Sequence, residues 1–574
     1  MKIISRLYNK TVLAATLAFG ILSSSCTDYL TIIPSDVVVE EEFWQSKDQV
    51  YGVLATSYLK LLSRDAVTKA IIWGELRSET MMYPSGYNPE IKNIIEANIA
   101  DDNSFCNWSI FYEAINYANL VLECAGNVIG RDPEFLESEL RVVKGEMYAM
   151  RALCHFYLVR TFRDIPLAMK SAKNDAEIPE YVQVHPLVAL DSIMSDLNRA
   201  EHMVLNSGAF SSPEDNYGRI TKNAVLAMKA DVNLWRAAFA KYYDAGNVNE
   251  YYDECLQNCR DVIANMDAEL KNKNLKNLGP MNLIKNDPVV GKKDNKSTAY
   301  DEIFGRKNSS ESIFELQVER DNITNGRFNG ACNVYGTQGK HGMVIVQQNF
   351  LKDNYCYLNG NKTIVNDYRI FSYTNVKRND LEENTASKTD ICAVKYASKE
   401  SPASGYRASD NWDANWIVYR RTDVLLMMAE AMVARSTAKN SDIIEAFNIV
   451  KTIRERSIIE DTKVVGEGKL DINDYISATE PKSIEDLIRK ERLLELAYEG
   501  KRWYDLVRKA LTDKSTDNIL FVADRLGGIA PVVKIKMKEI DALFMPIHID
   551  ELRYNDNLKQ NPAYDKEDSS IDMN

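Results

Sequence analysis

Residues 136–162 decide the fold class, and they read LESELRVVKGEMYAMRALCHFYLVRTF. Apolar residues recur here in steps of mainly three and four, at Leu136, Leu140, Val143, Met147, Met150, Cys154, Tyr157 and Phe162. This spacing places one apolar stripe along one face of a long helix. Asp132 and Pro133 predict where it starts, as a cap and a first-turn residue, and Asp164-Ile165-Pro166 predicts where it ends.

Similar helical patterns flank this stretch on both sides. We expect further helices at about 108–129, 186–205, 221–243 and 249–266, and again at about 416–436, 441–457 and 483–511. Their short connections favour antiparallel neighbours. Between them, about 267–415 is rich in Asn, Lys, Gly and Ser and holds strand-like runs at 313–318 and 343–346. The sequence therefore predicts a mainly α fold, in which paired antiparallel, tetratricopeptide-like helices scaffold a loop-rich region with a few short strands. No regular repeat signature can be aligned.

The N-terminus has the order of an export signal. Basic residues precede an uncharged apolar stretch from Thr11 to Leu22, which is too short to span a membrane, and small residues then lead to Cys26. A cysteine at this place resembles a bacterial lipoprotein signal, although Ser23 stands where such signals usually carry Leu. We expect removal of residues 1–25 and acylation of Cys26, because two or more acyl chains anchor a protein stably. Plain secretion with an incidental cysteine is the alternative.

Composition excludes several classes of function. The formal net charge is -13 with no basic block, which argues against nucleic acid and against a polybasic membrane patch. The cysteines after Cys26 form no metal-type pairs and mostly fall in helical apolar patterns, so we expect free, buried thiols. The histidines show no metal spacing, and no nucleophile, phosphate or dinucleotide motif is present. We therefore predict no catalysis, no cofactor and no metal centre.

Ordered motifs in the C-terminal third point to a family. They are Asp423-Val424-Leu425-Leu426-Met427-Met428-Ala429-Glu430-Ala431, Asn448 to Arg456, the run ERLLELAYEGKRWYDLVR at 491–508, Met545-Pro546-Ile547 and Gln560-Asn561-Pro562-Ala563-Tyr564. The N-terminal half adds Trp108, Tyr112, Ile115, Asn116 and Asn119, and the middle adds Ser312-Ile313-Phe314-Glu315. This set closely resembles the SusD/RagB family of Bacteroidetes outer-membrane lipoproteins. Arg163 and Ala563 stand where the family usually has Gly.

The resemblance covers the whole mature chain and implies its organisation and role. We expect a single SusD-like domain at 26–574, helical at about 40–266, loop-rich at about 267–415 and helical again at about 416–574. The resemblance implies a lipid-anchored protein at the cell surface, on the outer membrane. There it would capture an oligosaccharide or polysaccharide and deliver it to a TonB-dependent, SusC-like transporter.

Most motif residues are expected to build the scaffold. The charged residues of 491–505 are three or four apart and predict ion pairs that tie turns and neighbouring helices together. Trp503 and Tyr504 fit packing better than ligand contact. The family resemblance therefore rests on scaffold residues, which leave the ligand unidentified.

Sugar recognition needs flat apolar faces for the ring and planar polar groups for the hydroxyls. The candidates that we expect in loops are Trp73, Arg77, Tyr83, Tyr87, Tyr406, Asn411 and Trp412. The turn-rich run Tyr83-Pro84-Ser85-Gly86-Tyr87 presents two aromatic residues, as a binding platform requires. Because exposed tryptophan has the largest face, we expect Trp73 or Trp412 to dominate binding. The competing interpretation is that these aromatics only cover the surface or fasten loops.

Other functions remain open at this point. A helical-repeat scaffold that binds peptides or protein partners would show buried loop aromatics and no sugar binding. A surface glycosidase would need two carboxylates roughly 5–10 Å apart in one cleft. The cluster Asp410-Asn411-Trp412-Asp413-Ala414-Asn415 has oxygen ligands that suit structural calcium, but it lacks the glycine and terminal Glu of an EF-hand and fits a solvated turn better.

Overall fold

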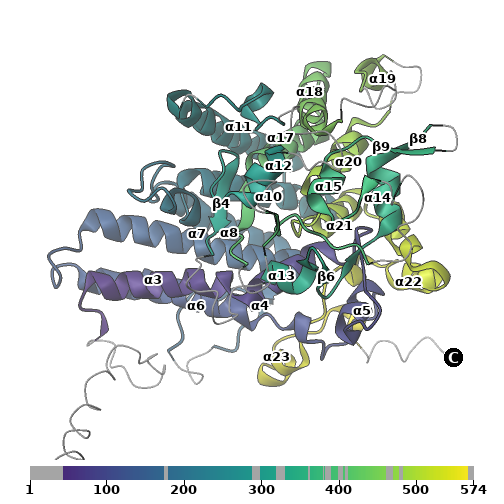
Figure 1. Cartoon of the computed structure of the whole chain (residues 1–574). Helices are drawn as coiled ribbons and strands as arrows, with labels where there is room; N and C mark the ends of the chain where they lie inside the picture. Colours follow the sequence, from purple (N-terminus) through teal and green to yellow (C-terminus); the bar gives the residue numbers. More distant parts are fainter. Residues whose placement is uncertain are drawn as a thin grey trace, which may run out of the picture.

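The structure is a computed structural model, shown in Figure 1, and it describes residues 43–173, 179–273, 275–286, 298–318, 330–359, 362–378, 381, 390–398, 405–407, 412–459, 470–477 and 482–565. Helices dominate these ranges, and the strands are short and paired two by two. The predicted fold class is therefore confirmed. No helix in these ranges combines the length and apolar character needed to cross a bilayer. The predicted signal and Cys26 lie outside the described residues.

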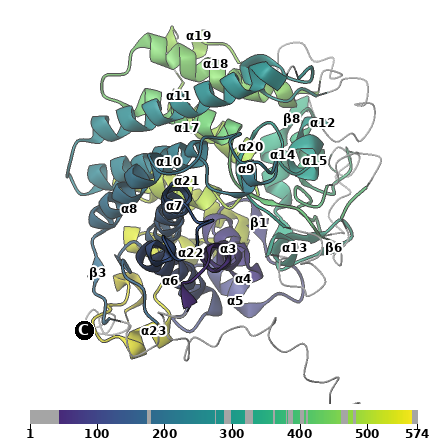
Figure 2. The ribbon, with the colours of Figure 1, turned by 90° about the vertical axis from the view of Figure 1, so that its left-hand side faces the viewer.

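A stack of long helices forms one side of the molecule. Each helix packs against the next, in the order α3 (Lys47–Leu62), α6 (Ser109–Cys124), α7 (Glu137–Phe162), α8 (Pro186–Glu201), α10 (Lys222–Tyr242), α11 (Val248–Lys273), α17 (Arg421–Ala434) and α18 (Asn440–Ser457). Figure 2 shows this stack rising from α3 to α18, with the loop-rich part beside it. The apolar stripe of each helix is buried against its neighbours, as the periodicity predicts.

Helix α7 begins later than the sequence predicts. Its first residue is Glu137, and Asp132 lies outside the helix. The Asp132 carboxylate instead accepts hydrogen bonds from the backbone N–H groups of Lys47, at 2.7 Å, and Glu134, at 2.9 Å. Asp132 thus joins the turn before α7 to the start of α3. The end of α7 at Phe162 is as predicted, and Arg163 follows it with a φ of +66°. This left-handed conformation explains why the family usually has Gly there.

The α6 motif fixes the segment that follows α7. The Asn119 side-chain amide donates to the carbonyl oxygens of Ala168, at 3.0 Å, and Lys170, at 2.9 Å. The Tyr112 hydroxyl donates to the carbonyl oxygen of Pro166, at 2.8 Å. These side chains supply hydrogen bonds to a backbone segment that has almost no sheet of its own. The motif residues therefore serve the scaffold, as expected.

The stretch expected as one helix at 483–511 is two helices, α20 (Ile484–Leu496) and α21 (Arg502–Asp513). Tyr498 and Gly500 both have a φ of +67°, which ends α20 and turns the chain. The turn passes over α4 (Arg64–Glu75) so closely that a Cβ on Gly74 would lie 1.8 Å from the Gly500 carbonyl oxygen. The prediction of a continuous helix is wrong because this contact between distant segments requires the break.

Two strands pair across the loop-rich region. β4 (Ser312–Leu316) is antiparallel to β10 (Trp416–Arg420), with Trp416 opposite Leu316. The sequence correctly predicts β4, but it assigns 416–420 to the start of a helix. That assignment is wrong because the β-branched and aromatic residues of 416–419 pair with β4, and α17 begins only at Arg421.

Smaller elements complete the loop-rich side. β1 (Met81–Met82) pairs with β7 (Ile345–Val346), β5 (Gly336–Thr337) with β6 (Lys340–His341), and β8 (Cys356–Asn359) with β9 (Lys362–Val365). The helices there are α12 (Thr298–Tyr300), α13 (Gly330–Tyr335), α14 (Gln348–Tyr355) and α15 (Arg369–Tyr373). Elsewhere lie α5 (Pro89–Ile95), β2 (Ile165–Pro166), β3 (Gln183–Val184), α9 (Asp215–Gly218), α19 (Asn473–Ile476), the 3-10 segment η9 (Asp517–Ile529), α22 (Ala530–Lys536) and α23 (Ile549–Tyr554).

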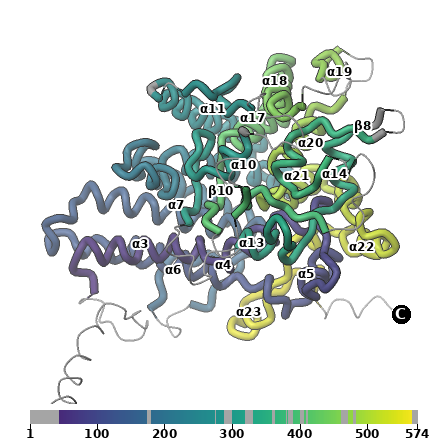
Figure 3. The backbone as a smooth tube through the Cα atoms, viewed as in Figure 1, coloured from purple at the N-terminus to yellow at the C-terminus, as the bar shows by residue number. Residues whose placement is uncertain are grey.

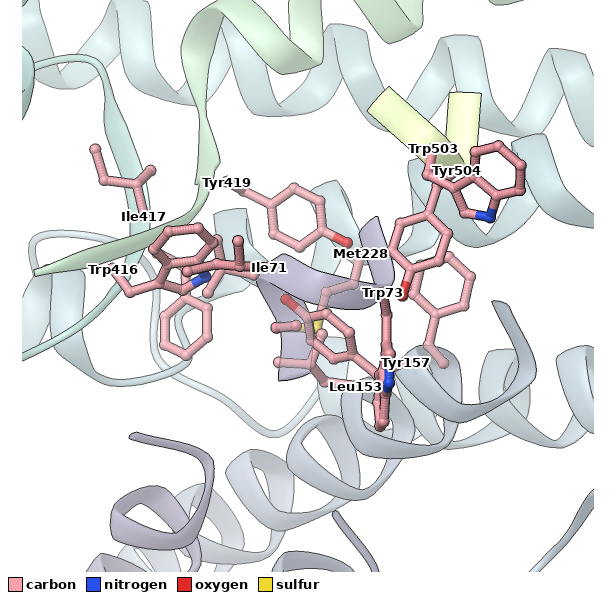
Figure 4. Close-up of a cluster of buried hydrophobic side chains, with 14 of the residues drawn as sticks. Ile71, Trp73, Leu153, Tyr157, Met228, Trp416, Ile417, Tyr419, Trp503 and Tyr504 are labelled. Atoms are coloured by element: carbon pink, nitrogen blue, oxygen red, sulfur yellow. The ribbon is translucent and has the colours of Figure 1, made fainter. Parts of the chain in front are cut away.

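An aromatic core joins α4 to the stack and to α21 (Figure 4). The Trp73 ring stacks on Phe111 with centroids 5.0 Å apart, and the Trp73 Nε1–H donates to the Phe105 carbonyl oxygen at 2.8 Å. Trp503 and Tyr504 are buried in the same region. The expectation that these two residues serve packing is confirmed.

The charged motif of α20 holds the loop-rich region against the helices. Glu495 accepts hydrogen bonds from Arg420 Nη1 at 2.9 Å and Arg456 Nη2 at 2.6 Å, and its other oxygen contacts Arg369 Nη1 at 3.2 Å. The side chains of Glu495, Arg369 and Arg420 are buried, and that of Arg456 is 4% exposed. Glu491 and Glu499 make equivalent pairs, with Arg369 and Arg454 and with Arg420 and Lys395. The predicted ion pairs therefore form: most join separate elements, and the pair of Asp505 with Arg508 spans one turn of α21.

The cysteines of the described chain are free thiols, and all except Cys356 are buried. Cys255 and Cys259 lie one turn apart on α11. This agrees with the prediction of free, buried cysteines, which here act as small apolar residues.

Candidate ligand-binding site

Tyr83, Tyr87, Lys92 and Glu96 form a compact group on the surface, here called the tyrosine patch. The Tyr83 and Tyr87 rings meet edge to face, with centroids 5.2 Å apart. Lys92 Nζ lies 5.4 Å from the centre of the Tyr87 ring and 3.3 Å from Glu96 Oε2. Tyr87 is 42% exposed, so it offers a flat apolar face to solvent, with a cation and a carboxylate nearby.

The local sequence holds the tyrosine patch in place. Gly86 has a φ of +76°, which turns the chain between the two tyrosines. Asn88 then caps α5, because its side-chain oxygen accepts the Glu90 N–H at 2.8 Å, and Pro89 occupies the first turn. Tyr83 donates its hydroxyl to Glu96 Oε1 at 2.7 Å. Burial, and then this hydrogen bond, raise the pKa of Tyr83 to about 12, so Tyr83 is a neutral donor at physiological pH.

The η9–α22 hairpin flanks the tyrosine patch. Arg525 Nη2 donates to the carbonyl oxygen of Ile95 at 3.5 Å, and Lys536 Nζ donates to Asn98 Oδ1 at 2.7 Å, so the hairpin is tied to the end of α5. Figure 3 shows α5 and α22 side by side. The outward side chains of the hairpin form a group of exposed apolar residues, here called the apolar stripe, which consists of Ile529, Val532 and Ile535.

Trp73 and Arg77 are not surface residues, so the expectation that they lie in a ligand-facing loop is wrong. Trp73 belongs to α4, a helix that the sequence analysis did not assign, and it is 1% exposed. Arg77 is also buried. Its guanidinium lies 4.4 Å from the Trp503 ring and donates to the carbonyl oxygens of Ala542 and Leu543. Both side chains fill the junction between α4 and the C-terminal segment.

Trp412 is also buried, at 2% exposure, so the prediction that it presents an open face is wrong. Tyr406 is half-buried, and burial raises its pKa above the ordinary range. Asn411 lies outside the described residues.

The oxygen-rich cluster at 410–415 is engaged in protein contacts where it is described. The Asp413 carboxylate accepts Arg407 Nε–H at 2.6 Å, and the Asn415 side-chain amide donates to Glu315 at 2.7 Å. Across the described residues, no group of three or more His, Cys, Asp or Glu side chains is arranged to hold a metal ion. Asp413 and Asn415 thus act within the protein, and their geometry does not favour calcium.

The assignment of Tyr83 and Tyr87 to a ligand site stays a prediction, and the sequence does not single out Lys92 and Glu96, which lie beside them. The available signal was their spacing of four on α5, one turn after the two tyrosines. Trp73 differs from the expectation because the apolar run before it belongs to the buried helix α4. The fold and the tyrosine patch together define a mainly helical scaffold that presents a small aromatic and charged surface beside its loop-rich side.

Comparison with known proteins gives the family. The family model described as "SusD family" matches residues 366–564, and the one described as "Starch-binding associating with outer membrane" matches residues 44–234. Two SusD-like proteins of Formosa agariphila are each 23% identical to this chain, one over 96% of this chain and 97% of its own length, the other over 85% and 88%. The chain belongs to the SusD/RagB family.

Solved structures support the same fold. A SusD homologue from Bacteroides thetaiotaomicron superposes with a TM-score of 0.65 at 18% identity, covering 91% of this chain and 98% of the homologue. A structure described as a laminarin-binding SusD-like protein superposes with a TM-score of 0.58 at 21% identity, covering 91% of this chain and 100% of that one.

Proposed function

We propose that this protein binds a glycan, an oligosaccharide or polysaccharide, at the cell surface through the tyrosine patch. The observation that carries the proposal is the exposed Tyr87 ring, held in place by Tyr83 and Lys92. A sugar ring stacks its C–H face on such a ring, while Lys92 and Glu96 offer a donor and an acceptor to its hydroxyls. The laminarin-binding relative supports a glycan as the ligand.

The proposed role is capture without catalysis. After removal of residues 1–25, the acylated Cys26 would anchor the protein to the outer membrane by lipid alone. The captured glycan would then pass to a TonB-dependent, SusC-like transporter. Family membership supports this partner and this location, and the family description that names the outer membrane agrees with them.

Affinity electrophoresis tests the proposal directly. The mature protein is run through gels that contain laminarin, starch, xylan or mannan, with bovine serum albumin as the control. We expect retardation by at least one polysaccharide and no release of reducing ends from it. Retardation by none of a broad panel would contradict glycan binding, and release of reducing ends would contradict the non-catalytic role.

The apolar stripe, which lies beside the tyrosine patch, favours a second role for this surface: contact with a protein partner. Ile535 is 73% exposed, Val532 precedes it by three residues on α22, and Ile529 directly precedes that helix. An exposed apolar patch beside a ligand site is typical of an interaction surface. We propose that the stripe contacts the transporter.

The variant Ile535→Glu tests this contact, because a charge there would be buried without a partner in the complex. We expect it to reduce co-purification of the transporter at least several-fold while glycan affinity is unchanged. The matched control is Val182→Glu, at an exposed apolar residue outside the hairpin. Equal co-purification of Ile535→Glu and wild type would exclude the stripe from the interface.

A further inference from the structure

Two cavities lie along α20, at a distance in sequence from the tyrosine patch. One, of about 330 Å³, lies between α20, α21 and η9. The other, of about 520 Å³, is walled by α14, β8, α18 and α19. Asp486 and Lys490 line both cavities, so the two meet at these side chains and are here called the α20 groove. Figure 3 shows α14, α18, α19 and α20 in the same part of the molecule.

The side chains that line the α20 groove include more bases than acids, in a chain whose formal net charge is -13. Its charged lining consists of the acids Asp367 and Asp486 and the bases Arg454, Lys482, Arg489, Lys490, Arg502 and Lys509. All of these bases except Lys490 have a carboxylate partner, in the pairs Arg454–Glu491, Lys482–Asp474, Arg489–Asp486, Arg502–Glu79 and Lys509–Asp513. Lys490 is therefore the exception.

Lys490 lies at the junction of the two cavities and makes no close ion pair among the described residues, although the carboxylates of Glu79 and Asp353 act to raise its pKa. Its Nζ donates to the side-chain oxygen of Asn354, which is neutral. Among the described residues no carboxylate oxygen lies within 4.0 Å of this nitrogen. Burial, and then the positive charge of Arg502, lower the pKa of Lys490 to about 8. A half-buried cation in this position is unfavourable until an anion joins it.

We propose that the α20 groove binds an anionic substituent of a glycan, a carboxylate or a sulfate group, with Lys490 as the charged donor. An ammonium group has three N–H donors, and Asn354 occupies one of them, so donors remain for the anion. The Tyr475 ring lines the same cavity and offers a face for the attached sugar. This inference rests on the proposed glycan-binding function and narrows its substrate class to acidic glycans.

Three dextrans with one backbone test the proposal: neutral dextran, carboxymethyl-dextran and dextran sulfate. Affinity of the mature protein for each is measured by calorimetry, for wild type and for Lys490→Met. We expect wild type to bind at least one charged dextran about ten-fold or more tightly than neutral dextran, and Lys490→Met to lose that difference. The two charged arms distinguish a carboxylate from a sulfate.

The control variant is Lys451→Met, which removes the same charge from the neighbouring helix α18 and should bind like wild type. Because Lys490 has no ion pair to lose, we expect the melting temperature of Lys490→Met to be no lower than that of wild type. If Lys490→Met is destabilised, Lys490→Gln takes its place in the binding measurements. Charged dextrans that bind no more tightly than neutral dextran, or that bind Lys490→Met as tightly as wild type, would overturn the proposal.

A second readout separates this proposal from the proposed function. Inorganic sulfate should raise the melting temperature of wild type and of Lys451→Met more than that of Lys490→Met. An equal rise in the melting temperature of wild type and both variants would contradict the anion site, but it would not bear on the tyrosine patch. A Tyr87→Ala variant that binds neutral glycan normally would count against the tyrosine patch and leave the α20 groove unaffected.

Discussion

Glu75 is a buried carboxyl group on α4 that links folding to pH. One oxygen accepts hydrogen bonds from the Thr80 hydroxyl at 2.9 Å and from the backbone N–H of Tyr498 at 3.2 Å. Burial raises its pKa from an ordinary value of 4.5 to about 7. The folded state therefore holds this proton more tightly than the unfolded state does. The resulting stabilisation is fully present below about pH 4.5 and is lost as the pH rises through about 7.

The variant Glu75→Gln cannot ionise and keeps an oxygen for the same two donors. We expect it to be more stable than wild type at pH 8, by as much as about 3 kcal/mol, and nearly equal at pH 4.5. Urea unfolding at several pH values measures this difference. The control is Glu113→Gln, which changes an exposed carboxylate. A difference between Glu75→Gln and wild type that does not grow with pH would contradict the assignment.

Burial distinguishes residues that look alike in sequence. Trp73 and Tyr87 are both aromatic residues close to a turn in the sequence. Trp73 is 1% exposed, whereas Tyr87 is 42% exposed. The apolar run Ala70-Ile71-Ile72 before Trp73 already favours a buried segment, but it does not show which neighbours cover the ring. The tyrosines are different because Pro84 and Gly86 place them at a turn, and turns lie at the surface.

At the scale of elements, α20 is the helix on which the loop-rich region depends. Glu495 of α20 accepts hydrogen bonds from Arg369, Arg420 and Arg456. These guanidinium groups lower the pKa of Glu495 although burial acts to raise it. Replacing both partners of such a cluster can be tolerated, but removing one leaves the others charged and unpaired.

We therefore expect Glu495→Ala to lower the free energy of unfolding by about 3–5 kcal/mol, with Glu495→Gln intermediate. The measurement is urea unfolding at neutral pH. Glu485→Ala, at an exposed position on the same helix, should change it by no more than about 0.5 kcal/mol. A loss below about 1 kcal/mol in Glu495→Ala would show that the cluster is not a main support of the fold.

The sequence predicts elements well where one helix face is apolar and the other polar. Helices α7, α8, α10 and α18 appear close to their expected bounds for this reason. It fails at Trp416–Arg420 and at 497–501, where a partner far along the chain decides the backbone. The pairing with β4 and the approach to Gly74 depend on tertiary contacts, and local periodicity carries no information about them.

At the scale of the whole molecule, anchoring is a separate prediction from the fold. In the variant Cys26→Ala no thiol is left to acylate, so we expect the protein to leave the membrane fraction. Fractionation of cells that lack the transporter measures this, because a tight complex with the transporter would also retain the protein. Membrane retention of Cys26→Ala in those cells would contradict a lipid anchor.

The family and the overall architecture are predictable from the sequence because the motif residues are the scaffold. Arg492 pairs with Asp505, and the Trp503 Nε1–H donates to the Leu543 carbonyl oxygen, so these buried motif residues hold separate parts of the scaffold together. The proposed ligand sites are only partly predictable from the sequence. Tyr83 and Tyr87 stand out at a turn, whereas Lys490 looks like any other lysine of a charged helix until its neighbours are known.

We propose that the tyrosine patch holds the glycan. Calorimetry of Tyr87→Ala with a polysaccharide that retards wild type tests it most directly, with Tyr554→Ala, at an exposed tyrosine on α23, as the matched control. We predict a loss of about 2 kcal/mol, roughly 30-fold in affinity, for Tyr87→Ala and none for the control. Wild-type affinity in a folded Tyr87→Ala variant would contradict the claim.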